Sequence, residues 1–535
     1  MRNMEWFGVT REGAVRARAV PLSRRRFLQS TALAAAAGPL AAGAARAQSS
    51  TLKVRSYGEI QVLDPANRLA SVEDAIFGAC LNKLIEFDTG TEFVWHKELA
   101  EEIEQVDPLT VKFTIRKGVP WSNGFGETTT EDVKFSFERI AGITDPNFQA
   151  AYRVDWEQLK EVEIVDAYSG VIHLNKPFAP LWTSSLPYGS GNIVCKKAVE
   201  AVGGSFTTEI PATNGPYYIK EWLPKQKTVL ARNPDYVGAK PAYDEIHVFP
   251  IEDDKAAELA YEAGDVDIAG VSISGVAKYR ESLPPNTKLM ERSPLAYIWI
   301  GANMASPRLS DVRVRRAIQH AIDVQAIIDG AFFGVPQPST GIIAPSLLGH
   351  RKKKLYERDV ERAKALVAEA GAEGLTIKLA TLNDTDYLTV AQIAQSNLAE
   401  MGITVEIDSH DSGTFWTLGD KNSPGWDQLD LILNRFTMAP DPSWATEWFT
   451  PRQIGIWNWE QFNSEEFDQL HQAAISETDQ AKRAEMYVRM QDLMEESGCY
   501  TFLTHGVNAY IYRDTIVPGV SPDGQGYVFR AFGMA

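Results

Sequence analysis

The chain has 535 residues, which is enough for three or four domains of ordinary size or for fewer large ones. Hydrophobic residues make up 44% and charged residues 23%, the balance of a soluble globular protein, so a largely disordered chain is excluded. The formal net charge is −17, and it becomes −23 without residues 1–47, which hold eight arginines, no lysine and two glutamates. A surface this acidic argues against nucleic acid or an anionic membrane as the main partner.

Residues 1–47 have the ordered features of an export signal. Residues 23–29 read SRRRFLQ, an alanine-rich segment covers residues 30–45, and Ala45-Arg46-Ala47 fits a small-x-small cleavage site. This pattern predicts a twin-arginine signal peptide that is cleaved near Ala47, and therefore a periplasmic location. A basic amphipathic helix is the alternative. The apolar segment is too short for a permanent membrane span of about 20 residues.

From residue 51 onward, the spacing of apolar residues predicts interleaved strands and helices. Apolar residues at every second position predict strands at residues 52–54, 110–116, 246–248 and 403–407. Further strands are expected at residues 228–231 and 376–380, and the stretch 500–512 is strand-like. Apolar stripes at helical spacing, with capping residues before them or a glycine after them, predict helices at about residues 130–140, 256–263, 311–322, 359–370, 388–401 and 480–496, and from residue 465. We therefore expect an α/β fold with mixed sheets covered by helices.

Residues 429–449 read LDLILNRFTMAPDPSWATEWF and form the most suggestive stretch. The apolar run at residues 429–433 suits a short buried strand. The loop expected after it carries a cation, a carboxylate and several aromatic rings: Arg435, Phe436, Asp441, Trp444 and Trp448. Such a loop past the end of a core strand is a common place for a binding site. The alternative is that the aromatic rings pack in the core and that Arg435 is a solvated surface charge.

The sequence has no recognisable catalytic or metal-binding motif. The eight histidines show no H-E-x-x-H spacing, and the three cysteines, Cys80, Cys195 and Cys499, show no C-x-x-C. The glycine patterns of a nucleophile elbow, a phosphate loop and a dinucleotide site are missing as well. We expect no catalytic residue, no metal and no cofactor. Two of the cysteines can pair in an oxidising compartment, but three do not make a disulfide scaffold, so the core must supply the stability.

Three groups of short stretches follow one another along the mature chain. Residues 99–136 include DPLT, RKGV, WSNG and TEDV; residues 214–268 include NGPY, RNPDY and GDVDI; and residues 303–371 include DVRVRRAI, AID and EAG. As an ordered set they resemble the solute-binding proteins of ABC importers in the dipeptide, oligopeptide and nickel family, known as family 5. The resemblance covers nearly all of the mature chain.

The resemblance implies a two-lobed fold with a hinge and three subdomains. One lobe would combine a discontinuous domain, at residues 48–86, 210–294 and 505–535, with an inserted domain at residues 87–209. The other lobe would cover residues 295–504. A ligand would be held between the lobes by hinge closure and delivered to an ABC permease and its ATPase subunits in the inner membrane. We expect a monomer.

The resemblance also implies positions for the ligand site. Glu59 aligns with an acidic cleft position of the peptide-binding relatives. In those relatives, a carboxylate that pairs with the peptide α-amine lies four residues before the proline of the cleft loop. Counting back from Pro442 gives Met438, whose thioether cannot form that charge-assisted pair. With a one-residue gap, Asp441 would take this role instead.

The remaining candidates are aromatic or cationic. Arg435 can hold a ligand carboxylate, because its guanidinium matches the geometry of that group. The side chains that can stack on the ligand or enclose it are Trp416, Phe436, Trp444 and Trp457.

Two functions are compatible with the sequence. The first is an extracytoplasmic solute-binding protein that captures a peptide or another small polar solute, including a carboxylated one, between its lobes. The second is an exported hydrolase or redox enzyme, which the twin-arginine signal suggests. The missing catalytic motifs and the long family resemblance favour binding, so we expect the protein not to be an enzyme.

Overall fold

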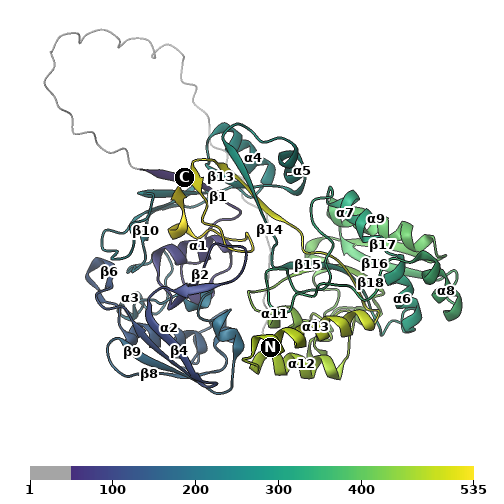
Figure 1. The fold of residues 1–535 in the computed structure, drawn as a ribbon, viewed down its shortest axis with the longest axis horizontal. Coiled ribbons are helices and arrows are strands. Elements are labelled where there is room, and N and C mark those ends of the chain that lie inside the picture. The colour runs from purple at the N-terminus through teal and green to yellow at the C-terminus, as the bar shows by residue number, and fades with distance from the viewer. Residues whose placement is uncertain (1–49) are drawn as a thin grey trace, which may run out of the picture. The chain divides into compact units, whose positions relative to one another are not determined.

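The computed structural model describes residues 50–535 (Figure 1). The predicted signal peptide and its cleavage site near Ala47 lie outside the described residues. Three larger β-sheets, each packed against helices, organise residues 50–535. Within this range, no helix combines the length and the apolar character that a membrane crossing needs.

The largest sheet has seven strands in the order β10-β11-β12-β1-β13-β20-β14. Its strands come from distant parts of the sequence: β1 (Thr51–Ser56), β10 (Tyr217–Leu223), β11 (Lys227–Arg232), β12 (Glu245–Pro250), β13 (Ile268–Gly270), β14 (Thr287–Arg292) and β20 (Asn508–Arg513). The purple strand β1 therefore lies in one sheet with teal and yellow strands (Figure 1). Leu52 and Val54 alternate as predicted, and both are fully buried. The helices that pack on this sheet are α1 (Ser71–Cys80), α4 (Asp254–Ala263) and α5 (Ile273–Glu281).

A four-stranded antiparallel sheet lies between residues 100 and 174. Its order is β4-β5-β9-β8, with bounds β4 (Ala100–Asp107), β5 (Thr110–Ile115), β8 (Leu159–Ile164) and β9 (Ser169–Leu174). The predicted stripe of α2 (Thr130–Ala141) is buried against it, and the helix ends at Gly142 in a left-handed conformation. Arg139 of α2 donates to both carboxylate oxygens of Asp64, at 3.0 and 2.6 Å, and so ties the short turn Pro65–Asn67 before α1 to this region. Smaller elements complete the region: β2 (Ile85–Phe87), β3 (Trp95–Lys97), β6 (Pro120–Trp121), β7 (Gly126–Glu127) and α3 (Lys196–Ala201).

A five-stranded sheet gathers residues between 296 and 504. Its order is β17-β16-β18-β15-β19, with bounds β15 (Ala296–Ala302), β16 (Thr376–Leu382), β17 (Thr404–His410), β18 (Leu431–Thr437) and β19 (Tyr500–Thr504). Strand β15 is buried on both faces. Ile298 and Ile300 pack in the core formed with α6 (Val312–Ala321), α7 (Val324–Ala331), α8 (Val360–Ala370) and α9 (Thr385–Ala399).

The alternate residues of β15, Tyr297 and Trp299, enter a second core on the opposite face of the sheet. The helices that contribute to this core are α11 (Pro442–Glu447), α12 (Glu465–Ser476) and α13 (Gln480–Glu496). The apolar stripe of the helix predicted at residues 480–496 packs in this core, where Met490 and Met494 of α13 are fully buried.

Two expectations about local structure are wrong. Strand β18 continues to Thr437, so Arg435 and Phe436 belong to the strand and not to a loop; pairing with β15, in which Arg435 lies opposite Ile298, extends it. The stretch 500–512 is not one strand but two, β19 and β20, which belong to different sheets. The chain turns between them at Gly506, whose φ of +82° suits glycine.

The three cysteines, Cys80, Cys195 and Cys499, are buried as free thiols. Within residues 50–535, no group of three or more His, Cys, Asp or Glu side chains is arranged to hold a metal ion.

Candidate functional site

A cavity of about 440 Å³ lies where segments that pack with different sheets meet. Most of its lining comes from residues 68–93, 152–155, 187–189 and 521–528, which pack with the seven-stranded and four-stranded sheets. The rest comes from residues 437–448, which begin at the last residue of β18 in the five-stranded sheet. The cavity is therefore closed by parts of the chain that different cores hold in place, as expected of a site that forms between two lobes.

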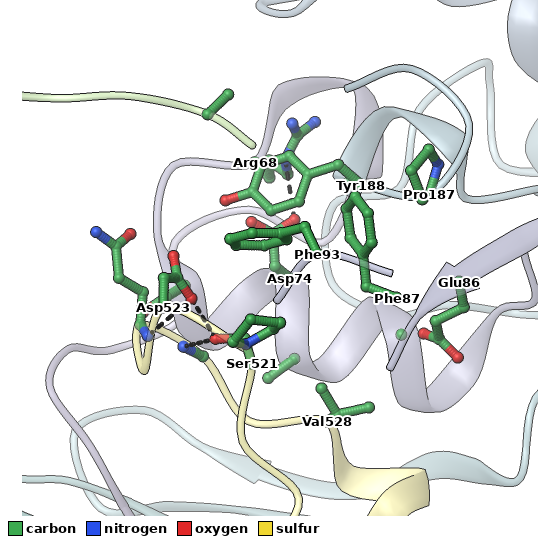
Figure 2. Close-up of a pocket in the computed structure, with 18 of the residues that line it drawn as sticks. Arg68, Asp74, Glu86, Phe87, Phe93, Pro187, Tyr188, Ser521, Asp523 and Val528 are labelled. Atoms are coloured by element: carbon green, nitrogen blue, oxygen red, sulfur yellow. Dashed lines mark hydrogen bonds and ion pairs between the residues drawn. The ribbon is translucent and has the colours of Figure 1, made fainter. Parts of the chain in front are cut away.

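Arg68 dominates the first wall. Its guanidinium is buried, with Nε 2.9 Å from Asp74 Oδ1 and one terminal nitrogen 3.9 Å from Asp155 Oδ2. It lies over the ring of Tyr152, 3.5 Å from the centroid, and 5.6 Å from that of Tyr188. Figure 2 shows Arg68, Asp74 and Tyr188 grouped together. Burial raises the pKa of Asp155 to about 6, although Arg68 opposes this shift. Arg68 is thus already satisfied within the protein.

The C-terminal segment supplies a second carboxylate of this wall. Asp523, on the yellow ribbon of Figure 2, is 3% exposed, and its Oδ1 accepts hydrogen bonds from Ser521 Oγ at 2.5 Å and from Gln525 N at 3.2 Å. Asn508 Nδ2 donates to the Asp523 carbonyl at 3.0 Å, which fixes the turn to strand β20. Burial raises the pKa of the Asp523 carboxyl above its usual value.

The opposite wall is apolar and aromatic. Met438 is 7% exposed, and its backbone N–H donates to Leu295 O at 2.9 Å, directly beyond the end of the β15–β18 pairing. Trp444 lies in α11, and Trp448 comes immediately after it. Their ring centroids are 6.2 Å apart in an edge-on arrangement. Of the predicted site residues, Met438 and Trp444 line the cavity.

Asp441 has a different position from the one expected of a ligand anchor. Its carboxylate is fully buried, caps α11 through Ser443 N, and lies 2.8 Å from Arg483 of α13 through each oxygen. Thr183 Oγ1, from the segment after β9, donates to Asp441 Oδ2 at 2.6 Å. Burial alone would raise the pKa of Asp441, but Arg483 and the hydrogen bonds hold it below its usual value. Asp441 thus links the two sides of the cavity through protein contacts.

The other predicted residues lie outside the cavity lining. Glu59 accepts a hydrogen bond from Trp222 Nε1 at 3.0 Å and one from Lys225 N. Phe436 lies in an aromatic cluster, with centroids 6.4 Å from Trp416 and 5.9 Å from Trp457. Arg435 is exposed on β18, and its guanidinium forms no ion pair within residues 50–535. Roles of these residues in ligand binding stay predictions.

Sequence reasoning missed the residues that dominate the first wall: Arg68, Asp74, Tyr152, Tyr188 and Asp523. None of them lies in a motif, and they are spread along the described chain from residue 68 to residue 523. The one local signal was the Ser521-Pro522-Asp523-Gly524 run, which predicts a turn but not what the turn faces.

The fold and the cavity define a binding protein of the two-lobed type. A family model described as "Bacterial extracellular solute-binding proteins, family 5 Middle" matches residues 95–454. The chain belongs to this family. This confirms the family that the sequence resembles and the two-lobed α/β fold expected from it.

Individual relatives agree over nearly the full length. The "Dipeptide-binding protein" of Escherichia coli is 26% identical over 520 residues, covering 92% of this chain and 94% of the relative. The "Probable D,D-dipeptide-binding periplasmic protein DdpA" of the same organism is 23% identical, covering 84% and 88%. The solved structure of HbpA2 from Haemophilus parasuis superposes with a TM-score of 0.79 at 24% identity and covers 91% of this chain and all of that one.

Proposed function

We propose that this protein captures a peptide or another small polar solute in the cavity and delivers it to the permease and ATPase subunits of an ABC importer. The observation that carries the proposal is the cavity itself, because its walls belong to different cores and can separate without unfolding either one. Both relatives are named as binding proteins, which favours this function over that of an exported enzyme.

The sheet topology guides our proposal for the lobes. The strands of the seven-stranded sheet fall in residues 48–86, 210–294 and 505–535, those of the four-stranded sheet in residues 87–209, and those of the five-stranded sheet in residues 295–504. We place the domain boundaries accordingly. The protein would act as a monomer, exported by the twin-arginine route and cleaved near Ala47.

The hydrogen bond between Thr183 and Asp441 would stabilise the form in which the two walls of the cavity are closed. This 2.6 Å hydrogen bond joins the side of the four-stranded sheet to the N-terminus of α11 beside the cavity. A hydrogen bond to a buried carboxylate contributes about 1.5–3 kcal/mol. That contribution would be present in the closed form and absent once the walls separate.

The Thr183→Val variant is therefore expected to bind solute at least about 10-fold more weakly, since each ~1.4 kcal/mol of lost binding free energy is a factor of ten in affinity. Isothermal titration calorimetry measures the affinity, and the melting temperature of the unliganded variant checks its fold. Thr208→Val is the matched control, because Thr208 is exposed and outside the cavity. Equal affinities for the two variants would show that this contact does not act in closure.

The proposed function is tested by thermal denaturation in the presence of the small-molecule filtrate of the periplasm. The expected result is a rise in melting temperature without consumption of any solute. Trp444→Ala should reduce this rise, since burying one large side chain against a ligand contributes about 1.5–3 kcal/mol. Turnover of a filtrate component by the purified protein would contradict the proposal.

A further inference from the structure

The charges around the cavity point to the class of solute. We infer that the solute carries a positive charge, in the form of an amine or a quaternary ammonium group, and that the carboxylate of Asp523 accepts it. This inference rests on the proposed function and makes it more specific.

Asp523 is the cavity carboxylate that the protein leaves without a cation. Both hydrogen bonds that it receives from other residues go to Oδ1, from Ser521 and Gln525. Within residues 50–535, no Lys, Arg or His side chain forms an ion pair with it, although the residue is only 3% exposed. A buried carboxylate without a counter-ion is costly. A cationic solute in the cavity would remove this cost on binding.

The other charges of the cavity are already paired. Among residues 50–535, five carboxylates and two cations line it, which leaves the site acidic. Arg68 is held by Asp74 and Asp155, and Lys83 lies 3.2 Å from Glu86. Asp88, the remaining acid, pairs with His96 at 2.8 Å. A solute carboxylate would therefore meet no free cation among the described lining residues, whereas a solute cation would meet Asp523.

Aromatic rings complete the fit to a cation. The lining includes Phe93, Tyr188, Trp444, Trp448 and Tyr527, and Figure 2 shows Phe93 and Tyr188 among the side chains around Asp74 and Asp523. Ring faces attract alkylammonium groups through their quadrupoles, most strongly where water is excluded. Arg68 already lies over Tyr152 in this way. The raised pKa of Asp523 agrees with a carboxylate that lacks a partner in the unliganded protein.

Peptides that differ only in charge test this inference. The probes are alanyl-alanine, its cationic amide, its anionic N-acetyl form and the neutral doubly blocked form, together with choline and its uncharged carbon isostere. Calorimetric titrations compare the wild type with Asp523→Asn, and with Asp265→Asn as a control of equal charge change at an exposed position outside the cavity. The periplasmic filtrate is tested in parallel by thermal denaturation.

The wild type should bind cationic probes at least about 10-fold more tightly than their neutral counterparts, as a charge-assisted contact implies. Asp523→Asn should lose this preference, and Asp265→Asn should keep it. The comparison within the wild type holds even where Asp523→Asn does not fold. If the filtrate stabilises the protein but neutral or anionic probes bind best, or if Asp523→Asn keeps the preference, the inference fails and the proposed function stands. If neither the filtrate nor any probe binds, both fail.

Discussion

Replacement of Arg483 by methionine is expected to lower the free energy of unfolding by about 3–5 kcal/mol, the usual cost of leaving one partner of a buried ion pair uncompensated. Arg483 is 1% exposed and lies 2.8 Å from both oxygens of Asp441, which is itself fully buried. Arg483 Nε also donates to Ala474 O at 2.7 Å, so its loss frees that carbonyl of α12 as well. Urea denaturation of the unliganded protein measures the change.

The double variant Asp441→Asn/Arg483→Met separates the charge effect from lost packing. The asparagine side chain can still accept the hydrogen bond from Ser443 N but carries no charge, so the double variant should recover more than half of the loss. A double variant no more stable than Arg483→Met would mean that packing, and not the orphaned carboxylate, explains the destabilisation.

A second large effect is expected at Glu460, which is fully buried beneath β15. Trp299 Nε1 donates to Glu460 Oε1 at 2.8 Å, and Gly301 leaves the space, since a Cβ there would lie 2.0 Å from this oxygen. Burial raises the pKa of Glu460 to about 7, despite the hydrogen bond from Trp299. Glu460 is therefore protonated in the folded protein at pH values at which it is ionised in the unfolded chain, where its pKa is ordinary. The contribution of the Glu460 carboxyl to the free energy of unfolding is complete below the unfolded pKa of 4.5 and is lost as the pH rises to about 7.

Glu460→Gln keeps an acceptor for Trp299 and removes the titration. Relative to the wild type, the variant should gain about 3 kcal/mol of stability between the two pKa values, at about 1.4 kcal/mol per pKa unit. Unfolding free energies measured across this pH range test the prediction, with the exposed Glu373→Gln as control. Parallel curves for Glu460→Gln and the wild type would rule out a protonated Glu460 in the folded protein.

Local patterns were sufficient where local pairing decides the structure. The alternation of Val111, Phe113 and Ile115 predicted β5, and the stripe of Tyr487, Met490 and Met494 predicted α13. Local patterns were insufficient where pairing with a strand far away in the sequence determines where a strand ends or which sheet it joins. The end of β18 depends on β15, and Tyr500–Thr504 and Asn508–Arg513 pair in different sheets, although their sequence reads as one strand.

In the candidate site as well, local sequence indicated some residues and missed others. Trp444 was expected near a cleft because it follows a core strand, whereas Met438 was expected there only from the family resemblance, by its place four residues before Pro442; both line the cavity. Asp441 looked like a free carboxylate in sequence, but a long-range partner, Arg483, neutralises it. Arg68 and Asp523 could not be found, since only the folded chain brings the segment before α1 and the C-terminal turn to one cavity.

Native mass spectrometry of the protein isolated from its own periplasm shows directly whether it carries a solute. We expect a species heavier than the bare chain by one small solute, with the Trp444→Ala variant recovered mainly without it. A bare chain that also takes up nothing from the periplasmic filtrate would mean that the protein does not bind solute.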